Sequence, residues 1–180
     1  MTGIEHWRRL KTYLKRLKIQ QIEQSLSAIE DNWREEYGPM AHMLPESYVH
    51  FLHIHGYSQF YLDEDLCLMF LPPQFARQHP LCSPSVLPFA FCEPAGAICV
   101  AFISHTDGVK VHAFDGEEEV GCEGDFDLWM AIQVSYFLRQ MASRRLNETI
   151  VASKAQRASF KPQILIDKVV PRPNHKDTSN

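Results

Sequence analysis

Three histidines lie within six residues of the segment LPESYVHFLHIHGY (44–57), at His50, His53 and His55. Imidazoles at this density can ligate a metal ion or transfer protons. On a helix His50 and His53 share a face, a spacing that permits metal binding. His55 falls roughly 140–160° away on the same helix, and no Glu completes an HExxH motif. We therefore expect structural or solvent-facing histidines, with a metal site and a small hydrolase using His50 or His53 as open alternatives.

Two other groups contain the residue types of nucleophilic catalysis. Ser104, His105 and Asp107 include all three members of a triad, but residues this close on one strand end cannot orient one another in a relay. Cys92 lies in apolar and acidic surroundings and lacks the base or positive charge that would form a thiolate. We expect a turn at the first group and a buried, inert thiol at the second. The chain is predicted to be no enzyme, with no catalytic residue, metal or cofactor.

Carboxylates dominate the middle of the chain. Residues 19–138 contain eighteen acidic and three basic residues, whereas residues 1–18 contain one acidic and six basic residues and residues 139–180 three and nine. The net charge of -4 hides this separation. An acidic centre between basic ends is a property that concerns partners rather than fold.

The densest acidic segment, DGEEEVGCEG (115–124), reads as a glycine-punctuated loop, and an earlier turn adds DED (63–65). These carboxylates either keep a sheet edge soluble or dock a basic partner, whose association they would accelerate. A calcium site would need a DxDxDG loop, which is absent. Tyr57, Phe60 or Tyr61 could anchor the partner or belong to the core. The predicted partner-binding residues are Asp63, Glu64, Asp65, Asp115, Glu117, Glu118, Glu119 and Glu123.

Helices are predicted on both sides of this acidic centre. Residues 1–18 form a basic amphipathic helix, which packs on its own domain or lies on an anionic membrane surface or a partner. A second apolar stripe at 22, 26, 29 and 33 predicts another helix or a bent continuation. Pro45 opens a third helix, which Gly56 ends and which buries the stripe Leu44, Tyr48, Phe51, Leu52 and His55.

Five short apolar runs follow, separated by DED, PP, EPAG and HTDG: YSQFYL, LCLMFL, VLPFAF, AICVAFI and VKVHAF. Such short connections exclude helical crossovers, so the sheet should be largely antiparallel. Asp125 can cap a long helix with the stripe Phe126, Met130, Val134, Phe137 and Met141. The predicted fold is α+β, with N-terminal helices, a central sheet of five or six strands and a long C-terminal helix packed on it. Residues 163–170 could be a late strand or a partner-binding segment.

The cysteine pattern and the hydropathy of the sequence indicate in which cellular compartment the protein is expected. Five cysteines with no CxxC pair argue against a disulfide framework or a structural zinc site. No apolar run approaches the ~20 residues of a membrane-spanning helix, and no secretory signal is evident. We expect a cytoplasmic protein.

The order of these motifs resembles the SUKH superfamily, which includes bacterial immunity proteins, Syd, yeast cell-wall-synthesis regulators and herpesvirus relatives. After IEQSLSAIE, the segment LPESYVHFL resembles its LP-x-x-Y-x-x-F-L signature, and VLPFAFCEPAGAICVAF resembles its later "pF-A … G … strand" segment. The GVKVHAFDGEEE hairpin and the GDFDLWMAI helix follow in the expected order. The match covers roughly residues 19–140. The chain departs from the family pattern in two places. After the signature helix, relatives carry a glycine pair where this chain has HIHGYS, and after the "pF-A" segment the acidic-glycine pattern is reduced to Glu93 and Gly96.

This resemblance implies protein binding rather than catalysis. It predicts an immunity protein that neutralises a cognate toxin with a basic surface, a nuclease, without touching nucleic acid itself. The alternative is an intracellular protein-binding scaffold or regulator. The implied organisation is a basic helix (1–18), a SUKH-like domain (19–145) and an extension (146–180) whose last ten residues are disordered. A homodimer and a weak membrane-surface contact of residues 1–18 are further expectations.

Overall fold

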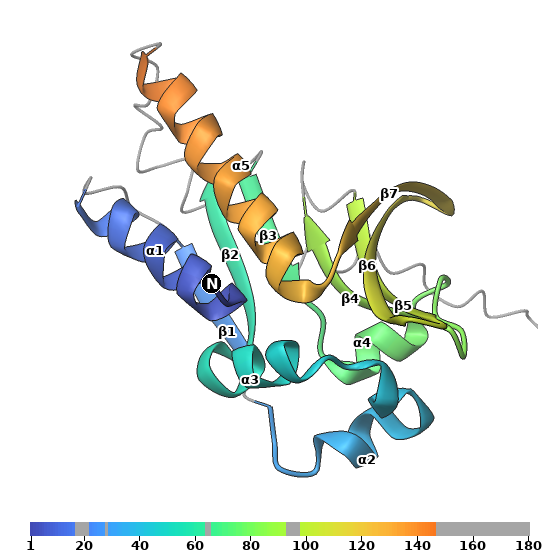
Figure 1. The fold of residues 1–180 in the computed structure, drawn as a ribbon. Helices are drawn as coiled ribbons and strands as arrows, with labels where there is room; N and C mark the ends of the chain where they lie inside the picture. The colour runs from blue at the N-terminus through green and yellow to red at the C-terminus, as the bar shows by residue number, and fades with distance from the viewer. Residues whose placement is uncertain (17–21, 28, 64–65, 93–97, 147–180) are drawn as a thin grey trace, which may run out of the picture.

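The computed structural model describes residues 1–16, 22–27, 29–63, 66–92 and 98–146. These residues form an α+β fold with N-terminal helices, a seven-stranded antiparallel sheet and a long C-terminal helix packed on it (Figure 1). The predicted fold class is therefore confirmed. The helical elements are α1 (Gly3–Arg16), α2 (Trp33–Tyr37), the 3-10 helix η1 (Gly38–Met43), α3 (Glu46–His55), α4 (Pro73–Gln78) and α5 (Phe126–Leu146).

The sheet is a simple meander in which each strand pairs with the next along the chain. The five predicted apolar runs all form strands, and β1 and β7 are added at the two edges. The TDG sequence forms the expected hairpin turn, where His105 pairs with Gly108 at a φ of 126°, a value that favours glycine. The strands are β1 (Ile22–Ser27), β2 (Tyr57–Asp63), β3 (Leu66–Phe70), β4 (Val86–Cys92), β5 (Ile98–His105), β6 (Gly108–Asp115) and β7 (Glu118–Gly124).

Two sequence predictions about local structure are wrong. Residues 22–27 form strand β1 rather than a helix, because they pair with β2 in register from Ile22 opposite Tyr61. The acidic segment 115–124 is no loop, since residues 118–124 form β7, which pairs with β6. The pairing shifts register twice, between Val111 and His112 and between Ala113 and Phe114. Such bulges bend a strand and redirect its side chains.

Helix α3 holds the centre of the core. It begins after Pro45, and the Gly56 N–H at its end donates to the Leu52 carbonyl oxygen at 2.7 Å. Tyr48, Phe51 and Leu52 are fully buried, as predicted. The Tyr48 ring lies 5.1–5.2 Å from three aromatic rings that come from β4, β5 and α5: Phe89, Phe102 and Phe126. Helix α3 thereby packs against β4, β5 and α5, and its buried side chains are part of the core.

Helix α1 packs on its own domain, as one of the two alternatives predicted. Trp7 is fully buried, and its ring lies 4.8 Å from Phe60 of β2 and 6.0 Å from Phe51 of α3. The Gly3 N–H donates to the carboxylate of Asp127 in α5. Figure 1 shows α1 and α5 side by side over the β1–β3 part of the sheet. Ile4, Leu10 and Leu14 are also buried, so this apolar face is covered within the molecule.

Helix α5 begins as the sequence predicts. The Asp125 carboxylate accepts a hydrogen bond from the Leu128 N–H at 2.8 Å, and the predicted stripe from Phe126 to Met141 is buried. Within the described part of the chain, no helix has both the length and the apolar character to cross a membrane. The segments 163–170 and 171–180, for which the sequence predicts a strand or partner-binding segment and disorder, lie outside the described residues.

Candidate functional site

The three histidines of α3 do not converge. His50 and His53 are exposed, whereas His55 is half-buried, with its ring 4.8 Å from Phe51 and 6.4 Å from Trp7. His55 therefore belongs to the core stripe, as its position on the helix predicts. Across the described residues, no group of three or more His, Cys, Asp and Glu side chains is arranged to hold a metal ion.

The side chains of His105 and Asp107, two of the three possible triad residues, contact different partners. Asp107 lies in the hairpin turn and forms an ion pair with Lys110 at 2.6 Å. His105 turns instead to His112 of β6, and their Nε2 atoms are 2.9 Å apart. The two rings are nearly parallel, with an interplanar angle of 17°. The predicted turn is thus confirmed, and the histidine has a partner that its local sequence does not reveal.

His112 links this pair to the acidic segment. It is 5% exposed, and its Nδ1 atom lies 2.8 Å from the Glu119 Oε1 atom of β7. A carboxylate beside Nδ1 favours the tautomer with a proton on that nitrogen. Nε2 of His112 is then an acceptor, and His105 donates to it through its own Nε2–H. Glu119, His112 and His105 form a hydrogen-bonded chain across three strands.

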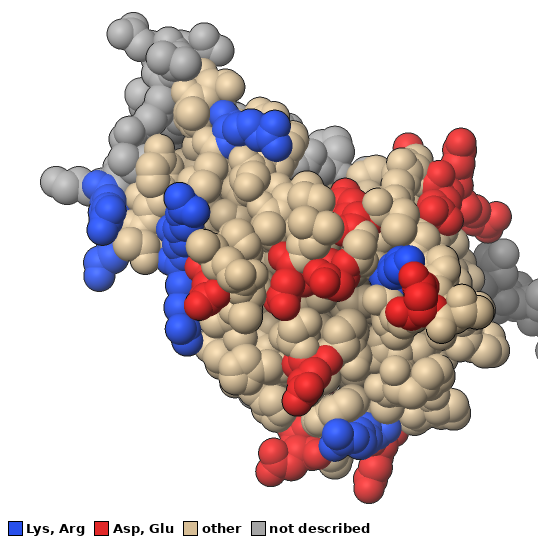
Figure 2. Space-filling view, in the orientation of Figure 1, with Lys and Arg blue, Asp and Glu red and all other residues tan. Residues whose placement is uncertain are grey.

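Four of the predicted partner-binding carboxylates gather at one hairpin. Asp115 ends β6, Glu117 lies in the turn, and Glu118 and Glu119 begin β7, with all four residues exposed. We call these four residues the acidic hairpin. Figure 2 shows red side chains projecting at the end of the molecule where β7 lies in Figure 1, and blue side chains along α1 at the opposite side. Within the described chain, Asp115, Glu117 and Glu118 form no ion pair.

Of the other predicted partner-binding residues, Asp63 and Glu123 lie outside the acidic hairpin. Asp63 ends β2, and Glu64 and Asp65 lie outside the described residues. Glu123 lies near the far end of β7 and is half-buried. The three aromatic residues considered as anchors are all part of the core, because their exposed fractions are at most 3%: Tyr57, Phe60 and Tyr61.

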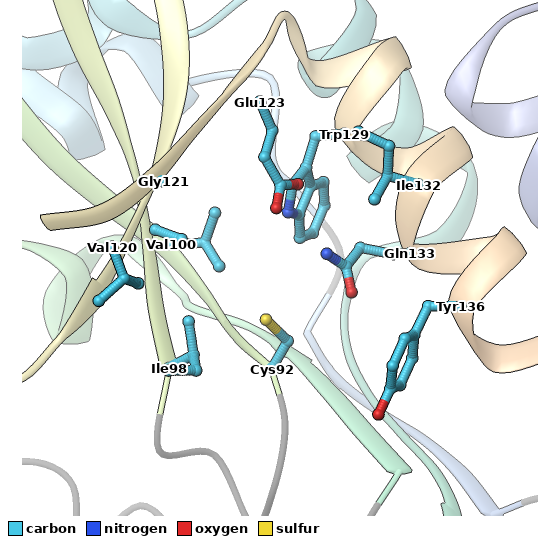
Figure 3. A pocket seen from close by; sticks show the side chains of 11 residues that line it. Cys92, Ile98, Val100, Val120, Gly121, Glu123, Trp129, Ile132, Gln133 and Tyr136 are labelled. Carbon is cyan, nitrogen blue, oxygen red and sulfur yellow. The ribbon is translucent and has the colours of Figure 1, made fainter. Parts of the chain in front are cut away.

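Glu123 lines a cavity of about 280 Å³ between α5 and the sheet, bounded by β4 to β7 (Figure 3). The walls are mainly apolar and include Val100, Val120 and Ile132. The α5 side contributes Trp129, Ile132, Gln133 and Tyr136, which are spaced i, i+3, i+4 and i+7 and so share one helix face. The sequence analysis did not identify this second stripe of α5. A glutamine among apolar residues at helical spacing could have indicated that this helix face lines a partly polar cavity.

The polar atoms of the cavity are incompletely paired. Burial raises the pKa of Glu123, and a hydrogen bond with Gln133 opposes that shift. The Oε2 atom of Glu123 and the Nε1 atom of Trp129 are buried, and neither has a hydrogen-bond partner among the described residues. Each such atom costs roughly 1–3 kcal/mol, so the fold maintains an unsatisfied acceptor and an unsatisfied donor at one cavity.

Comparison of this chain with models of protein families, with curated proteins and with solved structures finds no match in any of the three.

Proposed function

We propose that this protein is a non-enzymatic immunity protein that binds a cognate toxin, a nuclease, and blocks it through the acidic hairpin. The observation that carries the proposal is the cluster of exposed carboxylates on a hairpin whose Asp115, Glu117 and Glu118 have no ion-pair partner in the described chain. A nuclease needs a basic surface to hold phosphate. Carboxylates presented together attract such a surface and steer its approach.

The position of the acidic hairpin in the sheet supports the same proposal. Among the described strands, β7 pairs only with β6 and is therefore an edge strand. Carboxylates on an edge strand repel other sheet edges but leave the surface open to a cationic partner. The chain from Glu119 through His112 to His105 ties the base of the hairpin to β5. A hairpin held in this way loses little conformational freedom on binding.

The decisive experiment reverses the charge of the hairpin and leaves Glu119 in place, because Glu119 contacts His112. The triple variant Asp115→Lys, Glu117→Lys and Glu118→Lys is compared with Glu30→Lys, Asp31→Lys and Glu35→Lys. The control residues are also exposed, so both variants change the net charge equally. Affinity for the toxin encoded beside this gene, and rescue of cells that express it, are measured for both variants.

We expect the hairpin variant to lose at least tenfold in affinity at low salt, and the loss to shrink as salt screens the charges. The control variant should bind nearly as the natural protein does. Equal losses for both variants, or no loss for either, would refute docking through the acidic hairpin. A neighbouring gene that encodes no toxin, together with a stable complex with a housekeeping protein, would favour the alternative of an intracellular scaffold or regulator.

A further inference from the structure

A groove of about 500 Å³ lies between α1 and α5, on the side of the molecule where α1 places its basic residues (Figure 2). It is lined from α1 by Arg9, Thr12, Tyr13 and Arg16, and from α5 by Leu138. The spacing i, i+3, i+4 and i+7 places the four α1 residues on one face of the helix, and all four are exposed. Within the described chain, neither arginine forms an ion pair. This groove, which we call the arginine groove, therefore presents two positive charges without counter-charges.

The acidic hairpin is complementary to this groove in shape and in charge. Only Gly116 and Glu117 connect Asp115 to its pairing partner Glu118, and Gly116 has a φ of 61°. Two-residue connections form tight hairpin turns, so the hairpin ends in a narrow projection. The carboxylates on this projection are exposed and three of them have no ion-pair partner among the described residues: Asp115, Glu117 and Glu118.

The two surfaces do not meet within one molecule. Figure 2 shows the red side chains at the hairpin end and the blue side chains of α1 on opposite sides of the protein. A second copy of the chain offers each surface the charge that it lacks. Contact between two different surfaces is heterologous and joins copies head to tail, into a ring or an open chain.

We propose that the acidic hairpin of one copy docks in the arginine groove of a second copy. Carboxylates of the hairpin accept hydrogen bonds from the guanidinium groups of Arg9 and Arg16, whose forked N–H groups match a carboxylate in geometry. Exposed ion pairs are individually weak, so we expect a reversible contact with a Kd of about 0.1–1 mM. The proposal goes beyond the binding of a toxin and does not depend on it, although a toxin on the hairpin would exclude the second copy.

The test separates the two surfaces into two variants of the full chain. The groove variant is Arg9→Gln with Arg16→Gln, and the hairpin variant is Asp115→Asn with Glu117→Gln and Glu118→Gln. Sedimentation equilibrium at low salt gives the weight-average mass of each protein between about 0.05 and 1 mM. Across this range the mass of the natural chain should rise at least about 1.5-fold. Added salt should return it to the monomer mass, because salt screens exposed charges.

Mixing the variants shows which surfaces meet. Each variant alone should stay monomeric, because it lacks one of the two surfaces. In an equal mixture they should form a dimer and no larger species, since the hairpin of the groove variant can dock only in the groove of the hairpin variant. The control Arg8→Gln with Lys15→Gln removes the same charge at the same spacing from exposed positions of α1 outside the groove. It should associate as the natural chain does.

Three results would overturn the proposal. The first is a natural chain that stays monomeric, including one whose groove binds a small anion such as pyrophosphate instead. The second is an equal loss of association in the control and in the groove variant, and the third is a mixture of the two variants that stays monomeric. Toxin binding is decided separately, because the groove variant retains the hairpin and should bind the toxin as the natural chain does. Every substituted residue is exposed, so all variants should fold.

Discussion

The Nδ1 atom of His112 lies 2.8 Å from the Oε1 atom of Glu119, across the pairing of β6 with β7. This contact joins a nearly buried imidazole to a carboxylate of the acidic hairpin. It also determines which nitrogen of His112 faces His105, whose Nε2 atom is 2.9 Å from the Nε2 atom of His112. The hairpin is thus anchored to β5 through polar side chains as well as through backbone pairing.

We predict a specific tautomer at His112. In its neutral form His112 should carry its proton on Nδ1, because Glu119 accepts from that nitrogen, and neutral His105 should carry its proton on Nε2. Nitrogen-15 NMR of the imidazole rings distinguishes these forms. Glu119→Ala should mix the tautomers of His112, whereas Glu118→Ala should not. An Nε2-protonated His112 in the natural protein would contradict the assignment.

The buried tyrosines predict a loss of stability in alkali. The hydroxyl groups of Tyr37 and Tyr57 lie 3.1 Å apart, and burial raises the pKa of Tyr57 to about 12 and that of Tyr37 well above its ordinary value. An unfolded tyrosine has a pKa of about 10. The stabilising contribution is therefore complete below about pH 10 and lost as the pH rises through the folded pKa values.

This loss can be measured by urea unfolding at increasing pH. Tyr57→Phe should remove part of the alkaline loss while weakening the protein at neutral pH by roughly 0.5–1.5 kcal/mol, the typical contribution of one hydrogen bond. Tyr13→Phe is the control, because Tyr13 is 37% exposed. An alkaline profile that Tyr57→Phe leaves unchanged would show that this hydroxyl does not limit stability.

The raised pKa of Glu123 predicts that the stability of the protein depends on pH in the acidic range. Burial raises its pKa above the ordinary value of 4.5. Its contribution to stability is therefore complete below the unfolded pKa and lost as the pH rises through the folded pKa. Glu123→Gln should be more stable than the natural protein at neutral pH, and the difference should disappear on acidification below the ordinary pKa. Thermal melts across this range measure the effect, with Glu118→Gln as the exposed control.

Helix α1 should be required for stability. Trp7 is fully buried against Phe51 and Phe60, so Trp7→Ala should lower the free energy of unfolding by about 3–5 kcal/mol. Tyr13→Ala on the exposed face of the same helix should change it by roughly 0.5 kcal/mol or less. Chemical denaturation compares the two variants. Similar small effects for both would mean that α1 is not an integral part of the core.

Much of the fold follows from local patterns in the sequence. The alternation of short apolar runs with turn residues predicts β2 to β6, and a capping aspartate followed by an apolar stripe predicts α5. The β1 segment was misread because Ile22 and Leu26 are four residues apart, and four residues is close to one helical turn and also two strand periods. Pairing with β2 makes this segment a strand rather than a helix. Such pairing joins residues far apart in the sequence, so the local pattern does not reveal it.

The candidate site was less predictable for the same reason. The exposed carboxylates of the acidic hairpin follow from local sequence, because charged residues around a glycine turn remain in solvent. His112 and Glu119 meet across the register shift between Ala113 and Phe114 in the pairing of β6 with β7. Glu123 was grouped with the hairpin because its segment resembled a loop. In a strand beneath α5, its side chain lines a cavity instead.

The sequential strand order has a consequence for biosynthesis. Every strand pairs with its predecessor, so hairpins can form one at a time as the polypeptide leaves the ribosome, at about 5–20 residues per second. The exception is α1, whose Gly3 contacts Asp127 of α5. Helix α1 must therefore wait until α5 has been translated before this contact can form.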